Sequence, residues 1–256
     1  MISELAVVHP EAKIGTNVTI GPFSVIGKDV EIGDNTIIES HVVIKGPTLI
    51  GKNNHFFQFC SIGEAPQDKK YAGEPTTLRI GDENIIREFV TISRGTVQDH
   101  GETFVGNRNL LMAYVHIAHD CHVGSDTVFS NNASIAGHVR VGDKANLGGF
   151  VGVHQFCHIG SYSFCAGGSI ITKDVAPFVM VSGHPAQVHG LNQVGLRRRG
   201  FSEESIAALK QAYKIFFRQG HTAEEALGLI KDKYASINEV SDFIDSVETS
   251  ERGILR

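Results

Sequence analysis

Bulky apolar residues recur at every sixth position along most of this chain. The series starts at Val8, is unbroken as far as Ile62, holds the same phase over residues 80–92, and is regular again from Val105 to Ile171. An α-helix repeats its apolar face every 3.6 residues, and a half-buried strand repeats it every two. A period of six is instead typical of a parallel β-helix, in which short strands wind around a prism and each coil pairs with the next.

The repeat also predicts how the coils stack. A three-sided coil uses three hexads, so residues i and i+18 occupy equivalent positions in adjacent coils. The apolar residue of each hexad points inward and fills a narrow core. Glycine often follows it, as in Ile14-Gly15 and Val123-Gly124, and supplies either a positive φ or room for a close approach at a corner. The spacing predicts an all-β solenoid but leaves its handedness open.

Two stretches lack the repeat and are expected to leave the solenoid as loops. They are residues 64–79, of sequence EAPQDKKYAGEPTTLR, and residues 94–104, of sequence RGTVQDHGETF. A solenoid tolerates insertions only where they project from its surface. Loops on a rigid scaffold often carry function, so the first stretch is a candidate active-site flap. The alternative is a surface excursion without a role.

The repeat ends beyond residue 171, and helical signals replace it near residue 190. We therefore expect a β-helix over residues 1–186 and a small α-helical domain over residues 187–256. The apolar stripe of that domain is expected to form its core. The domain would pack on the solenoid or on a neighbouring copy of it.

Capping signals place three helices in this C-terminal part. Ser202 precedes an acidic turn and is a candidate N-cap, and the helix that it starts would end before Gly220. Thr222-x-x-Glu225 is a capping-box pattern for a second helix. Asn238 is a candidate N-cap for a third helix, which would close near residue 253.

Composition narrows the possible functions only a little. The net charge of −5 gives no electrostatic footprint for nucleic acid. No apolar run approaches the roughly 20 residues that span a bilayer, and the first residues lack the features of a signal peptide. We expect a cytoplasmic protein without a membrane span. The four cysteines form no CxxC pair, and Cys165 occupies a core position of the repeat, where it would act as a small apolar side chain.

The thirteen histidines include a cluster in which four fall within residues 116–122. Counting in steps of 18 places His119, Gly137 and Gln155 in one column, and it places Asp120 beside His138. Adjacent coils lie about 4.8 Å apart, so these residues would share one polar face.

His119 is the strongest candidate for catalysis in this cluster. It lies two positions past an inward-pointing residue, where a side chain projects outward. A neighbouring carboxylate, Asp120, could orient the imidazole, and an imidazole with an ordinary pKa near 6.5 suits a general base that activates a hydroxyl. Gly137 could point an unobstructed backbone N–H at a developing oxyanion. The alternative for any single histidine is a structural or merely exposed side chain.

A zinc site is the competing chemistry, because imidazole is a common zinc ligand. His122 and His158 share a column but lie two coils apart, about 9 to 10 Å, which one ion cannot readily bridge within a chain. Hexapeptide-repeat carbonic anhydrases solve this between subunits, but they need a further histidine where this chain has Ser163. We therefore expect no bound metal. A non-catalytic β-helix would need flat ladders of Thr or Ser, which this face lacks.

Several motifs together resemble one family of enzymes. They are HIAHDCHVG at 116–124, NNASIAGHV at 131–139, GVHQFCHIG at 152–160, LRRRGFS at 196–202, IGEAPQDKKYAGEP at 62–75 and TISRGT at 91–96. These motifs resemble the UDP-N-acetylglucosamine O-acyltransferases that begin lipid A synthesis. The resemblance runs through the solenoid into the helical domain.

The resemblance implies a left-handed parallel β-helix of hexapeptide repeats with a small C-terminal α-helical domain, assembled as a cytoplasmic homotrimer. It implies transfer of an (R)-3-hydroxyacyl chain from acyl carrier protein to the 3-hydroxyl of UDP-N-acetylglucosamine. No cofactor is implied beyond the phosphopantetheine of the carrier protein. His119 matches the family's general base, Asp120 the residue that supports it, and the Gly137 N–H the oxyanion donor.

The resemblance also implies a set of substrate-binding positions. Those expected to contact the sugar nucleotide or the acyl donor are Asp68, Lys70, His116, His138, His154, Gln155, Asn192, Arg198 and Arg199. Gly167 matches the position that limits acyl length. Each has a plain alternative: solvated charges for the arginines and the loop residues, a stacked polar side chain for Gln155, and a turn glycine for Gly167. Whether the sugar carries a 3-hydroxyl or a 3-amino group stays open.

Overall fold

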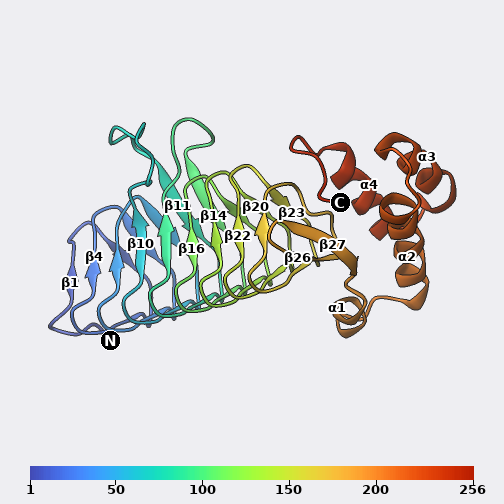
Figure 1. Cartoon of the computed structure of the whole chain (residues 1–256). Helices are drawn as coiled ribbons and strands as arrows, with labels where there is room; N and C mark the ends of the chain where they lie inside the picture. The colour runs from blue at the N-terminus through green and yellow to red at the C-terminus, as the bar shows by residue number, and fades with distance from the viewer.

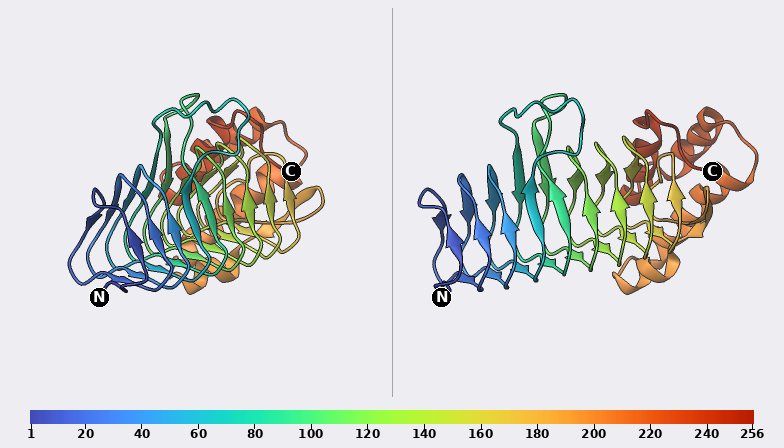
Figure 2. Two further views of the ribbon diagram at one scale, coloured as in Figure 1. Left: turned by 90° about the vertical axis from the view of Figure 1, so that its left-hand side faces the viewer. Right: turned by 60° about the vertical axis from the view of Figure 1, so that its left-hand side comes forward.

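The computed structural model describes residues 1–256, and its strands form the three sides of a long triangular prism (Figures 1 and 2). The first face contains nine parallel strands, which are β1 (Val7–Val8), β4 (Val25–Ile26), β7 (Val43–Ile44), β10 (Ser61–Glu64), β13 (Thr91–Ser93), β16 (His116–Ile117), β19 (Ser134–Ile135), β22 (Gly152–Val153) and β25 (Ile170–Ile171).

The other two faces are built in the same way. The second face contains β2 (Lys13–Ile14), β5 (Val30–Ile32), β8 (Thr48–Ile50), β11 (Thr77–Ile80), β14 (Glu102–Val105), β17 (His122–Val123), β20 (Arg140–Val141) and β23 (His158–Ile159). The third face contains β3 (Thr19–Ile20), β6 (Ile37–Ile38), β9 (His55–Phe56), β12 (Ile85–Ile86), β15 (Leu110–Leu111), β18 (Val128–Phe129), β21 (Asn146–Leu147), β24 (Phe164–Cys165), β26 (Val179–Gly183) and β27 (Ala186–Leu191).

The strand register follows the predicted step of 18 residues. His116 pairs with Ser134, and Ser134 pairs with Gly152. The residue after each of these points inward, and Ile117 and Ile135 are fully buried in a single apolar core. The prediction of stacked hexapeptide coils is therefore confirmed.

The corners of the prism correct one detail of the sequence prediction. Positive φ values at the corners belong to residues other than glycine, for example Asn17, Asp29 and Asn35. The glycines that follow the apolar residues serve close approach instead. A Cβ atom on Gly21 would lie 2.7 Å from the backbone of Glu39 in the next coil, so no other residue fits there without a shift.

Two loops leave the prism at the edge between the first and second faces. The segment 65–76 follows β10, the segment 94–101 follows β13, and the two project side by side (Figures 1 and 2). They lengthen the register step from 18 to 30 residues between Ser61 and Thr91, and to 25 between Thr91 and His116. Both loops end earlier than predicted, because β11 and β14 extend by two residues and pair with each other.

A strand hairpin and four helices close the C-terminal end (Figure 1). The strand β27 pairs antiparallel with β26 as far as Leu191, so the β-structure extends past the expected boundary at residue 186. The helices are α1 (Gln193–Arg198), α2 (Glu203–Arg218), α3 (Ala223–Tyr234) and α4 (Asn238–Glu248).

The predicted caps are confirmed for two of the helices. Ser202 caps α2, and Thr222 and Glu225 form a complete capping box on α3. The third expected cap is wrong by one residue, because the N-cap of α4 is Ile237, which offers no side-chain acceptor. The helix α1 was not predicted, since six residues are too few to display a helical period.

None of the helices is both long and apolar enough to cross a membrane. The four cysteines are free and buried. Burial raises the pKa of the Cys165 thiol to about 12, in keeping with its predicted place in the core.

Candidate active site

A groove of about 510 Å³ lies on the first face, beside the edge from which the loops project. Its lining includes His116, His119 and Gly137, together with the small residues that follow them along the face. The polar residues gather at one end of the groove, and the remaining surface is mostly apolar. The predicted clustering of histidines on one face is confirmed.

His119 and Asp120 form a hydrogen-bonded pair in this groove. The His119 Nδ1 atom lies 2.8 Å from Asp120 Oδ2. The His119 side chain is 15% exposed and that of Asp120 only 1%, so the imidazole faces the groove and the carboxylate lies behind it. This contact assigns the Nδ1 proton to the carboxylate side and leaves Nε2 as the free acceptor.

The carboxylate of Asp120 is held by the second loop. Thr96 donates to it twice, from its backbone N–H to Oδ1 and from its hydroxyl to Oδ2, both at 2.7 Å. Burial disfavours the charged carboxylate, but the hydrogen bonds from His119 and Thr96 outweigh that effect and lower the pKa of Asp120. The group is therefore ionised at neutral pH and can orient the imidazole.

Gly137 lies directly beneath His119, as the step of 18 residues predicted. A Cβ atom on Gly137 would lie 2.6 Å from His119 Cε1 and 2.8 Å from Nε2, so the imidazole occupies the space of the missing side chain. The Gly137 N–H donates no hydrogen bond within the chain and borders the groove. It is available to a ligand atom.

His138 and His116 surround this pair. The Nδ1 atom of His138 lies 2.9 Å from Asp99 Oδ2, and its Nε2 lies 3.8 Å from Asp120 Oδ2. His116 shares a hydrogen bond of 2.7 Å with Thr91. Burial, reinforced by nearby His119, lowers the pKa of His116, so its neutral form is favoured.

Two residues of the next coil are placed less uniformly. His154 borders the groove, with its Nδ1 atom 3.1 Å from the Gln155 carbonyl. Gln155 follows the predicted register, but its side chain is exposed and lies outside the groove lining. The predicted column is correct for the backbone, and the side chain simply extends into solvent.

The first loop reaches the groove through a residue that the sequence did not single out. Gln67 lines the groove, whereas Asp68 and Lys70 do not. Asp68 accepts a hydrogen bond of 2.9 Å from the Lys70 N–H and so forms a local turn, while the Lys70 side chain is exposed. Gln67 precedes both inside the quoted loop motif, but the hexad period says nothing about the path of a loop.

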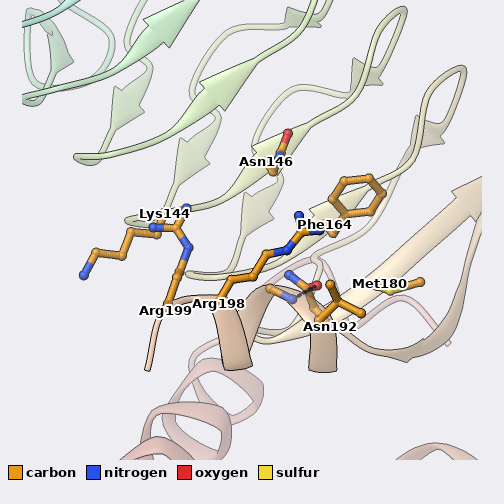
Figure 3. A pocket seen from close by; sticks show the side chains of 9 residues that line it. Lys144, Asn146, Phe164, Met180, Asn192, Arg198 and Arg199 are labelled. Carbon is orange, nitrogen blue, oxygen red and sulfur yellow. Dashed lines mark hydrogen bonds between the residues drawn. The ribbon is translucent and has the colours of Figure 1, made fainter. Parts of the chain in front are cut away.

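Asn192, Arg198 and Arg199 line a different cavity of about 440 Å³, between the third face and α1. Figure 3 shows the two arginines extending toward Lys144 and Asn146. Asn192 caps α1 by accepting from the Gly195 N–H, and it donates to the Tyr162 carbonyl. This cavity shares no residue with the histidine groove, so one chain presents the predicted site as two half-sites on different faces.

Gly167 lines neither half-site. It lies at the edge between the third and first faces, where a Cβ atom would contact the Gly149 carbonyl at 3.2 Å. Its expected role in acyl length stays a prediction.

Two histidine clusters bear on metal binding. In the column of His122 and His158, Arg140 lies between the two histidines, and its charge opposes cation binding there. His119, Asp120 and His138 offer ligand atoms within 4.8 Å of one another. The Asp120 oxygens already accept hydrogen bonds from His119 and Thr96, so this cluster is satisfied by protein partners.

Comparison with known proteins agrees with this architecture. The family model described as bacterial transferase hexapeptide (six repeats) matches residues 11–46 and 102–137, and the model of UDP-N-acetylglucosamine O-acyltransferase domain 2 matches residues 174–255. The solved UDP-N-acetylglucosamine O-acyltransferase of Moraxella catarrhalis is 50% identical, with a TM-score of 0.98 over 100% of this chain and 99% of that one. The Arabidopsis UDP-N-acetylglucosamine acyltransferase is 36% identical, with a TM-score of 0.89 over the whole of both chains.

Sequence relatives match equally completely. The acyl-(acyl-carrier-protein)–UDP-N-acetylglucosamine O-acyltransferase of Thiobacillus denitrificans is 55% identical over 100% of this chain and 99% of its own. The enzyme of the same name from Stutzerimonas stutzeri is 53% identical, with the same coverage.

The left-handed prism of hexapeptide coils, with a histidine and a buried carboxylate in its groove, defines the chain as a hexapeptide-repeat transferase. Within that class the full-length matches are to one group of enzymes. The chain belongs to the UDP-N-acetylglucosamine O-acyltransferase family.

Proposed function

We propose that this protein transfers an (R)-3-hydroxyacyl group from acyl carrier protein to the 3-hydroxyl of UDP-N-acetylglucosamine, the first step of lipid A biosynthesis, in the cytoplasm. The observation that carries the proposal is the His119–Asp120 pair above Gly137, in a groove of a chain that matches acyltransferases over its full length.

The geometry suits direct transfer without a covalent enzyme intermediate. His119 Nε2 takes the proton of the sugar hydroxyl while Asp120 holds Nδ1 and stabilises the imidazolium. The resulting alkoxide attacks the thioester carbonyl, and the Gly137 N–H donates to the oxyanion of the tetrahedral intermediate. Collapse breaks the C–S bond, and the imidazolium returns its proton to the departing thiolate.

The remainder of the groove suits an alkyl chain. Ala118, Ala136 and Gly152 leave a shallow path along the first face from His119 to Ile170. Burying methylene groups against such a surface stabilises a complex by about 0.8 kcal/mol each. The polar end can therefore hold the reacting atoms while the apolar end holds the acyl chain.

The second half-site suits the nucleotide. Arg198, Arg199 and Lys144 converge on one cavity (Figure 3), and guanidinium forks match the oxygens of a diphosphate. Because this cavity lies on another face, we propose that it completes the histidine groove of a neighbouring copy in a homotrimer. Such a head-to-tail interface closes into a ring when the rotation is threefold.

The edge between the third and first faces supports this assembly. Phe23, His41, Phe59, Phe89 and Tyr114 stack along it, with successive ring centroids 5.0, 5.2, 5.0 and 4.8 Å apart. The aromatic residues of this edge are 41 to 56% exposed, which is unusual for such a continuous apolar column. The two half-sites lie on the faces that flank this edge, so placing it on a threefold axis both buries it and brings unlike half-sites together.

The distribution of charge agrees with that orientation. The outward residues of the second face include Lys13, Glu31, Arg79 and Arg140. The outward positions at the start of each strand on the other two faces carry no Lys, Arg, Asp or Glu. The second face is therefore the one suited to water.

A transfer assay tests the proposed function. Purified protein, an acyl carrier protein charged with a 3-hydroxyacyl chain, and UDP-N-acetylglucosamine should give the 3-O-acyl sugar nucleotide. His119→Ala should lower kcat by about 10² to 10⁴, the usual contribution of a general base. His189→Ala, which alters an exposed histidine outside both half-sites, should leave it unchanged. Undiminished transfer by His119→Ala would contradict the mechanism, and no transfer by the unaltered protein would contradict the function.

A further inference from the structure

Arg94, the first residue of the second loop, ties the first loop to the solenoid. Its backbone N–H donates to the Glu64 carbonyl at 3.0 Å, where the first loop begins. Its Nη1 atom donates to the carbonyl oxygens of Gly63 at 2.5 Å and Gly46 at 3.0 Å, and its Nη2 atom donates to the Tyr71 hydroxyl at 3.2 Å.

These acceptors belong to three separate levels of the structure. Gly46 lies in the preceding coil, Gly63 at the exit of the first loop, and Tyr71 in the middle of that loop. A guanidinium is planar and holds its donors in a fixed geometry, so one side chain sets the positions of all three. A lysine could not bond the same set, because its single nitrogen would have to reach every acceptor.

The first loop has few other ties to the rest of the chain. Within it, the Tyr71 hydroxyl donates to the Glu74 carbonyl at 2.8 Å, and the Tyr71 N–H donates to the Asp68 carbonyl at 3.1 Å. Apart from a bond between the neighbours Ala65 and Glu64, the Arg94–Tyr71 contact is the sole hydrogen bond that joins residues 65–76 to the remainder of the molecule. The loop is braced internally and attached by one side chain.

The attachment lies beside the histidine groove. Gln67, in the same segment, lines the groove with Ser93, which immediately precedes Arg94. We infer that Arg94 and Tyr71 are positioning residues that hold the first loop against the groove and so shape the binding of the sugar nucleotide. This inference rests on the proposed function for its substrate, whereas the latch itself is a property of the loop.

Removing one oxygen atom tests the latch. Tyr71→Phe deletes the acceptor for Arg94 and keeps the ring. KM for UDP-N-acetylglucosamine should rise about tenfold, the effect of losing one hydrogen bond to a charged group, while kcat stays within about twofold. Amide hydrogen exchange should become faster in residues 65–76 and remain unchanged in β16 and β19. Arg94→Lys, which keeps the charge but not the fork, should give a smaller change of the same kind.

Tyr234→Phe is the matched control, because that hydroxyl makes no hydrogen bond and lies in α3, away from the groove. Unchanged KM and unchanged exchange in Tyr71→Phe would overturn the inference, as would a fall in kcat at constant KM. If the unaltered protein transfers no acyl group, the proposed function fails, but the exchange measurement still tests the latch.

Discussion

At the residue scale, the imidazole of His119 is fixed from two sides. Asp120 holds Nδ1 at 2.8 Å, and the absent side chain of Gly137 leaves the space that the ring occupies. The arrangement explains why a glycine is needed at a position whose φ is not in the left-handed region. Its role is to admit a neighbouring ring rather than to permit a turn.

Gly137→Ala should therefore damage activity more than stability. The added methyl group would lie 2.6 Å from His119 Cε1 and would displace the ring from Asp120 and from the substrate. We expect kcat to fall by about 10² or more, because both the base and the oxyanion donor are disturbed. Gly190→Ala, at a site with open space around the glycine, is the control in the transfer assay. Equal kcat values for the two variants would refute the steric role of Gly137.

Asp120 gives a prediction about pH. Its lowered pKa means that the folded state favours the carboxylate, so the contribution to stability is present above the pKa of an unfolded Asp, about 3.9, and is lost as the pH falls through the lowered folded value. Asp120→Asn should lower the free energy of unfolding at pH 7 by roughly 1.5 to 3 kcal/mol, the range for hydrogen bonds to a charged group. Urea denaturation at fixed protein concentration measures this difference.

The difference between Asp120→Asn and the unaltered protein should shrink below about pH 4. Asp232→Asn, at an exposed carboxyl in α3, should show no such dependence. A gap that widens toward acid, or no gap at pH 7, would show that the carboxylate is not favoured by the fold.

At the element scale, the solenoid is a regular stack interrupted by two loops. Each coil repeats the step of 18 residues that pairs His116 with Ser134, so the position of every outward residue depends on the count within its coil. The loops are exempt, because their residues do not contribute to the stack.

Inserting one residue should therefore have opposite effects in the two settings. A Gly added after Gly73, in open space at the first loop, should change Tm by no more than about 2 °C, since loop closure depends weakly on length. A Gly added after Asn131, at a corner between β18 and β19, breaks the register beneath the groove. Tm should then fall by on the order of 10 °C. Thermal unfolding followed by circular dichroism compares the two, and equal tolerance would contradict the coil count.

The same distinction explains which features could be predicted from the sequence. The period of six sets the register, and with it the column of His119 and Gly137, because those coils contain no insertion. Gln67 could not be found in this way, since a loop's path depends on contacts such as that of Arg94 with Tyr71. The corner aromatic residues with positive φ, such as Phe23, also follow no local rule, because that conformation usually favours glycine or asparagine.

The count also ends where the repeat ends. Beyond residue 171 the arginines could be recognised only by motif, and no spacing argument placed them on a face other than that of His119. The hairpin of β26 and β27 carries the chain along the third face before α1 begins, which fixes Arg198 and Arg199 there. Their separation from the histidine groove is a tertiary result.

At the scale of the whole molecule, the chain presents two incomplete half-sites and an exposed aromatic edge between them. A monomer would leave the diphosphate half-site on one face and the base on another. In the proposed homotrimer, each groove is completed by a neighbour, and every subunit contributes to two sites. The central claim is that acyl transfer needs His119 from one copy and the arginines from the next.

Mixing two inactive variants tests that claim most directly. His119→Ala and the double variant Arg198→Ala, Arg199→Ala should each transfer acyl groups poorly when assembled alone. Co-expressed with different tags and purified through both, they should regain a clear fraction of the unaltered activity, because some interfaces then pair an intact groove with intact arginines. Mixed assemblies that stay as inactive as their parents, although both chains are present and folded, would contradict a shared site.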